Sequence, residues 1–313
     1  MPCYHGVISA DRPQEREGYE NTVSLREFEE QMEWLGQNFQ CLGLKDAMQW
    51  LERPIGGKPA LLVSFDDGYR NNLTLAAPVL KRLGIPAIFF MSTGYIGGKR
   101  LLWPLEMDAR LEHSAGVELK LPGESASQVI QPGRDERKQL GERLRKILKG
   151  VPNQERMRYL EYLREKTVLD TAKIDRELND FMSWEEVRQL AAMGFDIGAH
   201  TEEHPILSRL NQQELDRELG TSKQKLEQEL GAPIRAIAYP NGGKADYTSE
   251  VIKRVKYWGY SEAFCVDEQM QKPWADGGAR YEISRVIVPG HLARSTFRFL
   301  ASGIKELGKQ ARN

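Results

Sequence analysis

The sequence predicts an α/β fold: a distorted (β/α)7-type barrel of mainly parallel strands with a helical insertion. Short apolar runs alternate along the chain with segments whose apolar residues recur at helical spacing, which is typical of parallel strands joined by helices. Seven of these runs suit strands, enough for a sheet that closes, or nearly closes, into a barrel. An open doubly wound sheet is the alternative. The expected strands are residues 2–8, 60–65, 85–91, 195–199, 234–239, 261–266 and 283–288.

Capping signals mark where several of the helices begin and end. Ser24 and Ser183 each stand three residues before a glutamate, which is the spacing of a capping box. Gly84 and Gly231 follow segments with apolar residues at helical spacing, where a helix commonly ends. The expected helices outside the insertion are residues 24–36, 44–51, 72–83, 183–194, 211–230, 249–258 and 295–307.

We expect one domain over residues 1–313, with the helical insertion at about residues 97–182. Within the insertion, residues 134–166 are dominated by charged side chains, and their leucines and isoleucine form an apolar stripe. We interpret the charged side chains as a solvated helix face rather than a binding patch. Trp103 and Pro104, near the start of the insertion, are candidates for substrate contact.

Composition and charge exclude several classes of protein. With 313 residues, 40% of them hydrophobic and 28% charged, the chain is typical of a soluble globular protein. Its formal net charge of -1 gives no overall attraction to nucleic acid or to anionic membranes. The three cysteines are far apart in the sequence, which argues against a disulfide framework. No apolar run is long enough to span a bilayer and no signal segment opens the chain, so we expect a cytoplasmic protein.

Residues that bind metals or carry protons follow the ends of the expected strands. Asp66 and Asp67 end one strand, His200 ends another, and Asn241 follows a third, while His5 lies within the first. The carboxyl ends of the strands gather at one end of a barrel, so we expect these residues to lie together. Two adjacent carboxylates repel each other, which raises the pKa of one unless a cation is near. The alternative is a plain turn at the Asp-Gly dipeptide.

His200 and His204 are separated by three residues, a spacing that presents two imidazoles to one cation if the backbone turns between them. Each histidine alone is equally compatible with a capping or core role. Together with the Asp66-Asp67 pair they predict a site of two imidazoles and one carboxylate. Such a site keeps open positions for water, as catalytic metal sites do. The second carboxylate is then free to act as a base.

Three segments of the chain stand out, which are Ser64-Phe65-Asp66-Asp67-Gly68, His200-Thr201-Glu202-Glu203-His204 and Ala238-Tyr239-Pro240-Asn241-Gly242. They resemble the first three motifs of the polysaccharide deacetylase family, the carbohydrate esterases of the NodB-homology type, and they follow the family's order. The resemblance implies that Asp67, His200 and His204 hold a divalent metal, usually zinc. Two imidazoles and a carboxylate also accept cobalt, nickel or iron. The resemblance further implies that Asp66 is the general base and that the backbone N–H of Asn241 stabilises the oxyanion.

The sequence departs from the family pattern at two positions of the third motif. Ala238 stands where an arginine that orients the base is common, and Asn241 stands where an aromatic residue is usual. Arg285 resembles the arginine that some family members carry on a late strand, which implies that it orients the base. For the general acid, His5 lies in a segment that resembles the opening strand of some relatives, and His291 is the alternative.

The resemblance implies a metal-dependent hydrolase that removes an N-acetyl, or other N-acyl, group from an amino sugar of a poly- or oligosaccharide or its precursor. We expect it to act in surface polysaccharide metabolism on an N-acetylated carbohydrate substrate, with no nucleic-acid partner and no stable membrane insertion. The oligomeric state stays open. One alternative is hydrolysis of another non-peptide C–N bond, as in allantoinases and deformylases. The other is a non-catalytic glycan-binding relic, which Ala238 and Asn241 keep open.

Overall fold

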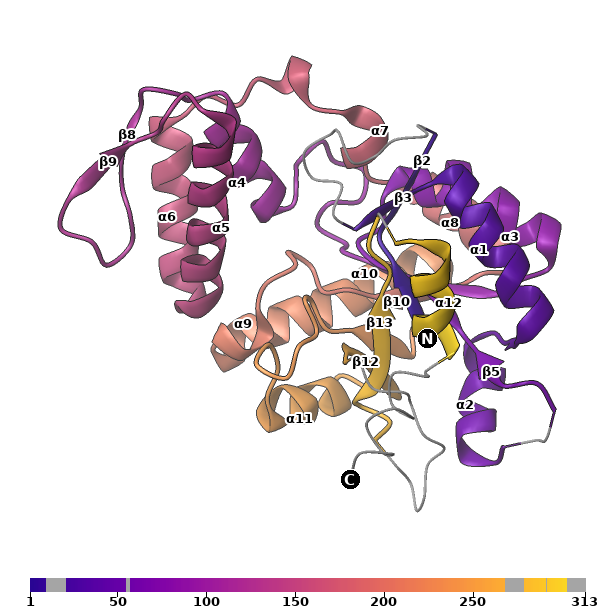
Figure 1. Cartoon of the computed structure of the whole chain (residues 1–313). Helices are drawn as coiled ribbons and strands as arrows, with labels where there is room; N and C mark the ends of the chain where they lie inside the picture. The colour runs from indigo at the N-terminus through magenta and orange to yellow at the C-terminus, as the bar shows by residue number, and fades with distance from the viewer. Residues whose placement is uncertain (10–20, 55–56, 268–278, 291, 303–313) are drawn as a thin grey trace, which may run out of the picture.

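Seven parallel strands form a closed barrel in the computed structural model, which describes residues 1–9, 21–54, 57–267, 279–290 and 292–302 (Figure 1). Their order around the barrel is β1-β13-β12-β11-β10-β7-β6, and β1 also pairs with β6. This last pairing closes the sheet, so the predicted barrel is confirmed and the open doubly wound sheet is wrong. The strands are β1 (Pro2–Tyr4), β6 (Val63–Phe65), β7 (Ala87–Met91), β10 (Asp196–Ala199), β11 (Ala236–Ala238), β12 (Glu262–Val266) and β13 (Ile283–Ile287).

Helices surround the barrel. Capping boxes at Ser24 and Ser183 begin α1 and α8, as their sequences predict, and Asn211 forms a third at the start of α9. The helix expected over residues 211–230 is interrupted by the π-turn η5 (Arg217–Thr221), and α3 is preceded by another, η2 (Asn72–Ala76). The helices are α1 (Leu25–Asn38), α2 (Leu44–Glu52), α3 (Ala77–Leu83), α8 (Trp184–Ala192), α9 (Gln212–Asp216), α10 (Ser222–Leu230), α11 (Ser249–Tyr257) and α12 (Arg294–Ser302). The expected end of the last helix, beyond residue 302, lies outside the described residues.

Two expected strands are each divided in the structure. The first breaks at His5: β1 stays in the barrel, whereas β2 (Gly6–Ile8) leaves it and pairs with β3 (Thr22–Ser24). Likewise β5 (Ala60–Leu61) pairs with β4 (Gln40–Cys41) before β6 enters the barrel. The prediction of a single strand over residues 2–8 is therefore wrong, because the backbone turns away from the barrel at the histidine.

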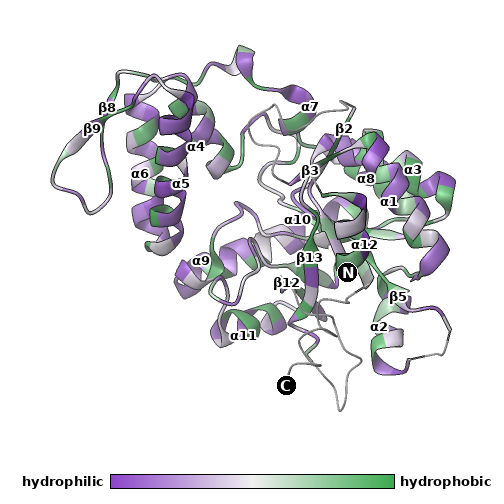
Figure 2. Cartoon of the chain, viewed as in Figure 1, coloured by the Kyte–Doolittle hydropathy of each residue, from purple (hydrophilic) through white to green (hydrophobic). Residues whose placement is uncertain are grey.

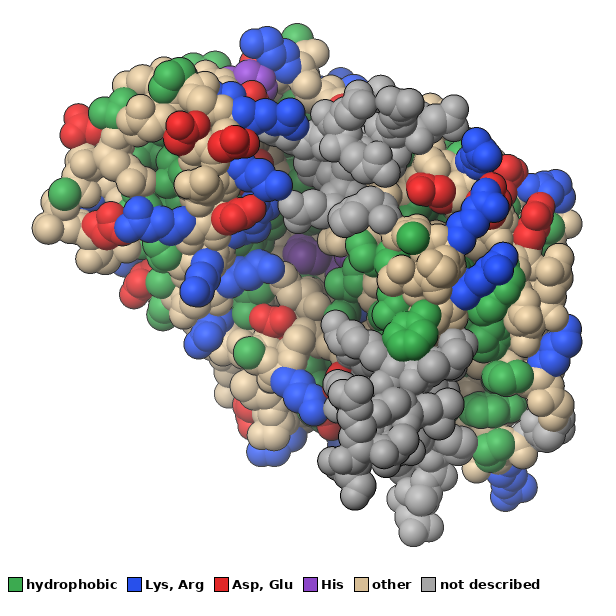
Figure 3. Space-filling view, viewed as in Figure 1, with side chains coloured by type: hydrophobic (Ala, Val, Ile, Leu, Met, Phe, Trp, Pro, Cys, Tyr) green, Lys and Arg blue, Asp and Glu red, His purple; other side chains and the backbone are tan. Residues whose placement is uncertain are grey.

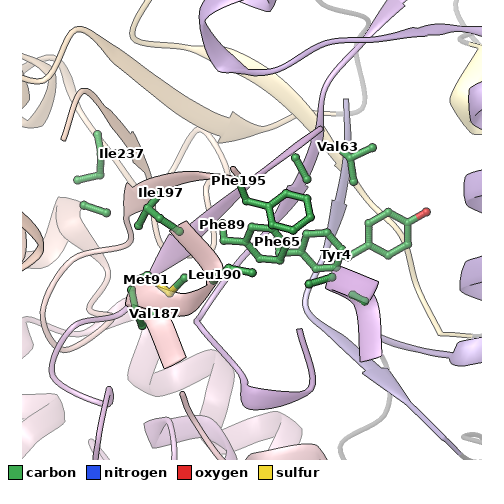
Figure 4. Close-up of a cluster of buried hydrophobic side chains, with 14 of the residues drawn as sticks. Tyr4, Val63, Phe65, Phe89, Met91, Val187, Leu190, Phe195, Ile197 and Ile237 are labelled. Atoms are coloured by element: carbon green, nitrogen blue, oxygen red, sulfur yellow. The ribbon is translucent and has the colours of Figure 1, made fainter. Parts of the chain in front are cut away.

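Successive residues of β7 face opposite sides of the barrel wall, because side chains alternate along a strand. Phe90 contacts Phe264 of β12, with ring centroids 5.2 Å apart. Since β12 is not a neighbour of β7, this contact crosses the barrel interior. Phe89 faces the helices and stacks on Phe65 at 4.6 Å, and Figure 4 shows these two rings in a row with that of Tyr4.

The segment between residues 97 and 182 contains its own small core. Three helices, α4 (Trp103–Glu112), α5 (Arg134–Gly150) and α6 (Asn153–Lys166), pack with the hairpin of β8 (Glu118–Lys120) and β9 (Ser127–Val129). In Figure 1 this bundle stands to one side of the barrel, and Figure 2 shows α5 as largely hydrophilic along its surface. A short 3-10 turn, η3 (Thr171–Lys173), and α7 (Arg176–Asn179) lead back to the barrel. The division into one domain with an insertion remains a proposal.

Among the helices that the structure describes, none combines the length and the apolar character needed to cross a membrane.

Candidate active site

The two aspartates occupy a tight turn at the carboxyl end of β6. Asp66 still belongs to the barrel, because its backbone N–H donates to the carbonyl of Tyr4 at 2.9 Å. Asp67 has φ 73° and Gly68 has φ 89°, so the backbone turns sharply here. A Cβ at Gly68 would lie 2.9 Å from the Met91 sulfur, so glycine suits this position on two counts. Both neighbouring carboxylates lie near His200 Nε2, which is 3.8 Å from Asp66 Oδ2 and 3.6 Å from Asp67 Oδ1.

His200 ends β10 and is held by the neighbouring strand. Its Nδ1 lies 2.8 Å from the carbonyl oxygen of Ala238 at the end of β11. Only a protonated ring nitrogen donates to a carbonyl, so Nε2 is left with its lone pair. Such a second contact commonly fixes the orientation of a metal-binding histidine.

The loop between the two histidines is strained and heavily anchored. Thr201 and His204 both have positive φ, at 66° and 51°. The Thr201 hydroxyl accepts a hydrogen bond from the backbone N–H of His204 at 3.1 Å. The backbone N–H groups of Glu202 and Glu203 both donate to one carboxylate oxygen of Glu218, at 3.0 and 2.8 Å. These bonds bring His204 back beside His200, with ring centroids 4.9 Å apart.

Asp67, His200 and His204 converge on one point. Asp67 Oδ1 lies 3.6 Å from His200 Nε2 and 3.4 Å from His204 Nε2, and one potential ligand atom from each residue lies within 4.8 Å of the others. Ligand atoms about 2.1 Å from one tetrahedral ion are about 3.4 Å apart. Asp67 Oδ1 is also buried and has no hydrogen-bond partner among the described residues. The three residues therefore fit a single zinc-sized ion.

Electrostatics favour a cation at this point. Burial, followed by the neighbouring charge of Asp66, raises the pKa of Asp67 well above its usual range. Burial lowers the pKa of both His200 and His204, which keeps the imidazoles neutral. Neutral imidazoles are the form that binds metals, and a bound cation would stabilise the Asp67 carboxylate.

Asp66 has a different environment, because it is paired with Arg285. The guanidinium donates from Nη1 to Oδ1 at 2.6 Å and from Nη2 to Oδ2 at 2.9 Å, and both side chains are buried. Burial alone would raise the pKa of Asp66, but the charge and hydrogen bonds of Arg285, together with the charges of His200 and His5, hold that pKa below its usual range. Cys3 also donates its thiol to Asp66 Oδ2 at 3.4 Å. Asp66 is thus a fixed carboxylate with Oδ2 3.8 Å from His200 Nε2.

The structure brings His5 to the same site. Its backbone carbonyl accepts a hydrogen bond from the Asn72 side chain at 2.7 Å, and its ring Nδ1 is buried without a hydrogen-bond partner among the described residues. The pKa of His5 is lowered to about 4, chiefly by burial. The charge of Asp66 raises this pKa and that of His200 lowers it. The alternative acid, His291, lies outside the described residues.

Asn241 follows β11 in the turn after Pro240, with φ 59°. The carbonyl of Pro240 accepts from the N–H of Gly242 at 2.7 Å, which tightens this turn. The Asn241 N–H itself makes no hydrogen bond within the described residues, so it is available to a ligand.

Two contacts at the site are not predicted from the sequence. Cys3 lies two residues before His5, and strand alternation is a signal that could have placed both on one face. Glu218 lies in η5, fourteen positions after His204, and no local pattern connects it to the loop that it anchors.

Comparisons with known proteins agree with the motifs. The family model for polysaccharide deacetylase matches residues 53–263. A putative polysaccharide deacetylase, YxkH of Bacillus subtilis (strain 168), is 35% identical over 119 residues. That match spans 37% of this chain and 39% of the relative, so it covers less than half of either protein.

Solved structures share the fold. The Streptococcus pyogenes deacetylase PplD, determined in complex with acetate, has a TM-score of 0.60 at 14% identity and covers 96% of both chains. IcaB from Ammonifex degensii has a TM-score of 0.57 at 20% identity, over 96% of this chain and 94% of that one. With the family model matched over most of its barrel, this chain belongs to the polysaccharide deacetylase family.

Proposed function

We propose that the protein is a metal-dependent hydrolase that removes an N-acetyl group from an amino sugar of a poly- or oligosaccharide or its precursor, in surface polysaccharide metabolism. The observation that carries the proposal is the convergence of Asp67, His200 and His204 beside a separate, arginine-bound carboxylate, Asp66. Membership of the family supports it.

Asp67, His200 and His204 would hold the metal, most suitably zinc, because two imidazoles and a carboxylate match its preferred ligands. A divalent ion bound there would polarise the acyl carbonyl and lower the pKa of water. Asp66 takes the proton of the attacking water. Its bidentate contact with Arg285 keeps it ionised and fixes its orientation.

Two further groups complete the proposed reaction. The free N–H of Asn241 donates to the oxygen of the tetrahedral intermediate, a contact typically worth about 10² to 10³ in rate. His5 passes a proton to the leaving amine. Because the pKa of His5 is lowered to about 4, it is neutral at rest, so it must receive that proton during the reaction. Asp66 removes a proton from the attacking water, and His5 delivers a proton to the leaving amine. The products are therefore acetate and a free amine.

The geometry also bears on the alternatives. A glycan-binding relic needs no oriented base, yet Arg285 pairs with Asp66 in a chain whose third motif has Ala238 in place of an arginine. This favours an enzyme. Hydrolysis of other C–N bonds uses the same groups, so the substrate must be tested directly.

The test is acetate release by the purified protein after chelation and reloading with zinc, cobalt, nickel or iron(II). N-acetylglucosamine oligosaccharides, UDP-N-acetylglucosamine and allantoin serve as parallel substrates. We expect acetate from at least one N-acetyl sugar, only after metal is restored, and no turnover of allantoin. Metal-independent turnover, or turnover of allantoin alone, would overturn the proposal.

A further inference from the structure

Arg156, on α6 of the insertion, is a buried charge that forms no ion pair with the residues that the structure describes. Its side chain is 4% exposed. Nη2 donates to Asn153 Oδ1 at 2.5 Å, but Nε is buried and has no partner among the described residues. Among the described residues no carboxylate lies within 4.0 Å of this guanidinium, and the carboxylates that act on it from further away are those of Glu218 and Glu214. A buried cation is usually paired, since an unpaired one loses its hydration without compensation.

The neighbouring acidic groups are committed elsewhere. Glu214 accepts from the Asn153 side chain at 2.9 Å through one oxygen and caps α9 at Asn211 through the other. Glu218 accepts two backbone N–H groups of the metal-site loop. Burial also raises the pKa of Glu218 to about 7, so its negative charge is incomplete near neutral pH. Neither residue forms an ion pair with Arg156 within 4.0 Å, although the charges of both raise the pKa of Arg156, which burial lowers.

A second unsatisfied donor lies against the same guanidinium. Arg156 stacks over the ring of Trp103, with Cζ 5.3 Å from the ring centroid. The indole Nε1 of Trp103 is buried and has no hydrogen-bond partner among the described residues. A tryptophan N–H normally finds a partner when it is buried. Trp103 is also the residue whose position at the start of the insertion suggests substrate contact.

Arg156 lies at the junction between the insertion and the loop that carries His204. Asn153, one turn earlier on α6, bonds to α9 of the barrel. Tyr95 donates its hydroxyl to the carbonyl of Glu203, next to His204, at 3.5 Å. Burial is the largest influence on the pKa of Tyr95 and raises it, whereas the positive charge of Arg156 lowers it. Arg156 therefore lies near enough to Tyr95 for its charge to act on the phenol. Figure 3 shows a histidine in the hollow between the insertion and the barrel, with Lys and Arg side chains on the insertion side.

We propose that Arg156 binds an anionic group, a carboxylate or a phosphate, carried by the substrate. The proposal rests on the deacetylase function above and adds that the substrate is an acidic N-acetylated saccharide. Guanidinium groups bind carboxylate and phosphate through paired hydrogen bonds, and the free Nε of Arg156 supplies one of these donors. The indole N–H of Trp103, buried and without a partner among the described residues, would donate to a hydroxyl or to the same anion.

The test measures binding to the metal-free protein, in which turnover does not interfere. Three probes are compared by calorimetry: chitotetraose, which is neutral; a tetrasaccharide of alternating glucuronate and N-acetylglucosamine; and UDP-N-acetylglucosamine. Wild type should bind one of the two anionic probes at least tenfold more tightly than chitotetraose. Arg156→Met should weaken that probe by about 10- to 100-fold and change chitotetraose by less than about threefold. Arg156→Lys, which keeps the charge, should fall between.

Arg158→Met is the matched control, because Arg158 is an exposed residue of the same helix and its loss changes the net charge equally. It should leave all three affinities unchanged. The preferred anionic probe tells a carboxylate site from a phosphate site. If wild type binds neutral and anionic probes alike, the inference is wrong even if Arg156→Met fails to fold, since this comparison needs no variant. Equal weakening of all probes by Arg156→Met would also overturn it.

The two proposals fail in different ways. Absence of acetate release from every probe by the zinc-loaded wild type contradicts the deacetylase function. Selective loss of anion binding in Arg156→Met would still support the anion site in that case.

Discussion

Arg285 donates hydrogen bonds to both carboxylate oxygens of Asp66, although the two residues are 219 positions apart in the sequence. The contact runs inside the barrel, because β13 and β6 are separated by β1. It makes two adjacent aspartates unlike: Asp66 is neutralised by a permanent cation, whereas Asp67 Oδ1 has no hydrogen-bond partner among the described residues. The first carboxylate suits a base and the second suits a metal ligand.

Replacing the base should separate catalysis from metal binding. Asp66→Asn should lower the rate of acetate release by about 10² to 10⁴, the usual contribution of a general base. Zinc content, measured by mass spectrometry after dialysis, should stay at the wild-type level. Asp67→Asn is the matched control and should lose the zinc as well as the activity. Unchanged turnover by Asp66→Asn would exclude it as the base.

Removing Arg285 should leave a buried carboxylate without its partner. We expect Arg285→Met to lower the free energy of unfolding by about 3 to 5 kcal/mol. The double variant Asp66→Asn/Arg285→Met should recover part of this loss, because the uncompensated charge is gone. Urea unfolding of wild type, Asp66→Asn, Arg285→Met and the double variant measures the coupling free energy between the two residues. Strictly additive losses would mean that the ion pair is not the cause.

Metal should stabilise the protein through Asp67. Chelation should lower the melting temperature of wild type and added zinc should restore it, because binding to the folded state alone is stabilising. Asp67→Asn removes a buried carboxylate beside Asp66, so without metal it should melt no lower than wild type. Its melting temperature should not respond to zinc. A zinc response equal to wild type would remove Asp67 from the ligand set.

Glu218 should affect the affinity for the metal although it is not one of the proposed ligands. Glu218→Ala leaves the N–H groups of Glu202 and Glu203 without their acceptor, so the loop carrying His204 should loosen and zinc affinity fall by about 10- to 100-fold. Glu218→Gln keeps an acceptor oxygen and should stay within about threefold of wild type. Competition against a zinc-binding dye measures both. Equal losses in the two variants would point to the charge rather than the hydrogen bonds.

The same residue should make stability depend on pH. Burial raises the pKa of Glu218 from 4.5 to about 7, so between these values the folded state binds more protons than the unfolded state. The contribution of Glu218 to the free energy of unfolding is therefore fully present below about pH 4.5. It is lost as the pH rises through about 7, by roughly 3 kcal/mol in total. Glu218→Gln should lack this component. As the pH is raised from 5 to 8, the unfolding free energy of Glu218→Gln should increase relative to that of wild type. A difference that stays constant over this range would contradict the raised pKa.

The barrel and the metal ligands follow from local features of the sequence. Apolar runs mark the seven strands, and the aspartate and histidine motifs stand at the ends of two of them, so their meeting at one end of a parallel barrel is predictable. The family was also identifiable from those motifs, and the family model confirms it. The role proposed for each residue stays a prediction.

The sequence by itself therefore determined the fold class, the family and which three side chains meet, since each depends on short patterns and on the common direction of the strands. Only the tertiary structure decided the break at His5, the contact of Cys3 with Asp66, the anchoring of the His204 loop by Glu218, and the buried Nε of Arg156, which has no partner among the described residues. These depend on which side chains face each other once the barrel is closed and the insertion is docked, and no sequence spacing encodes that distance.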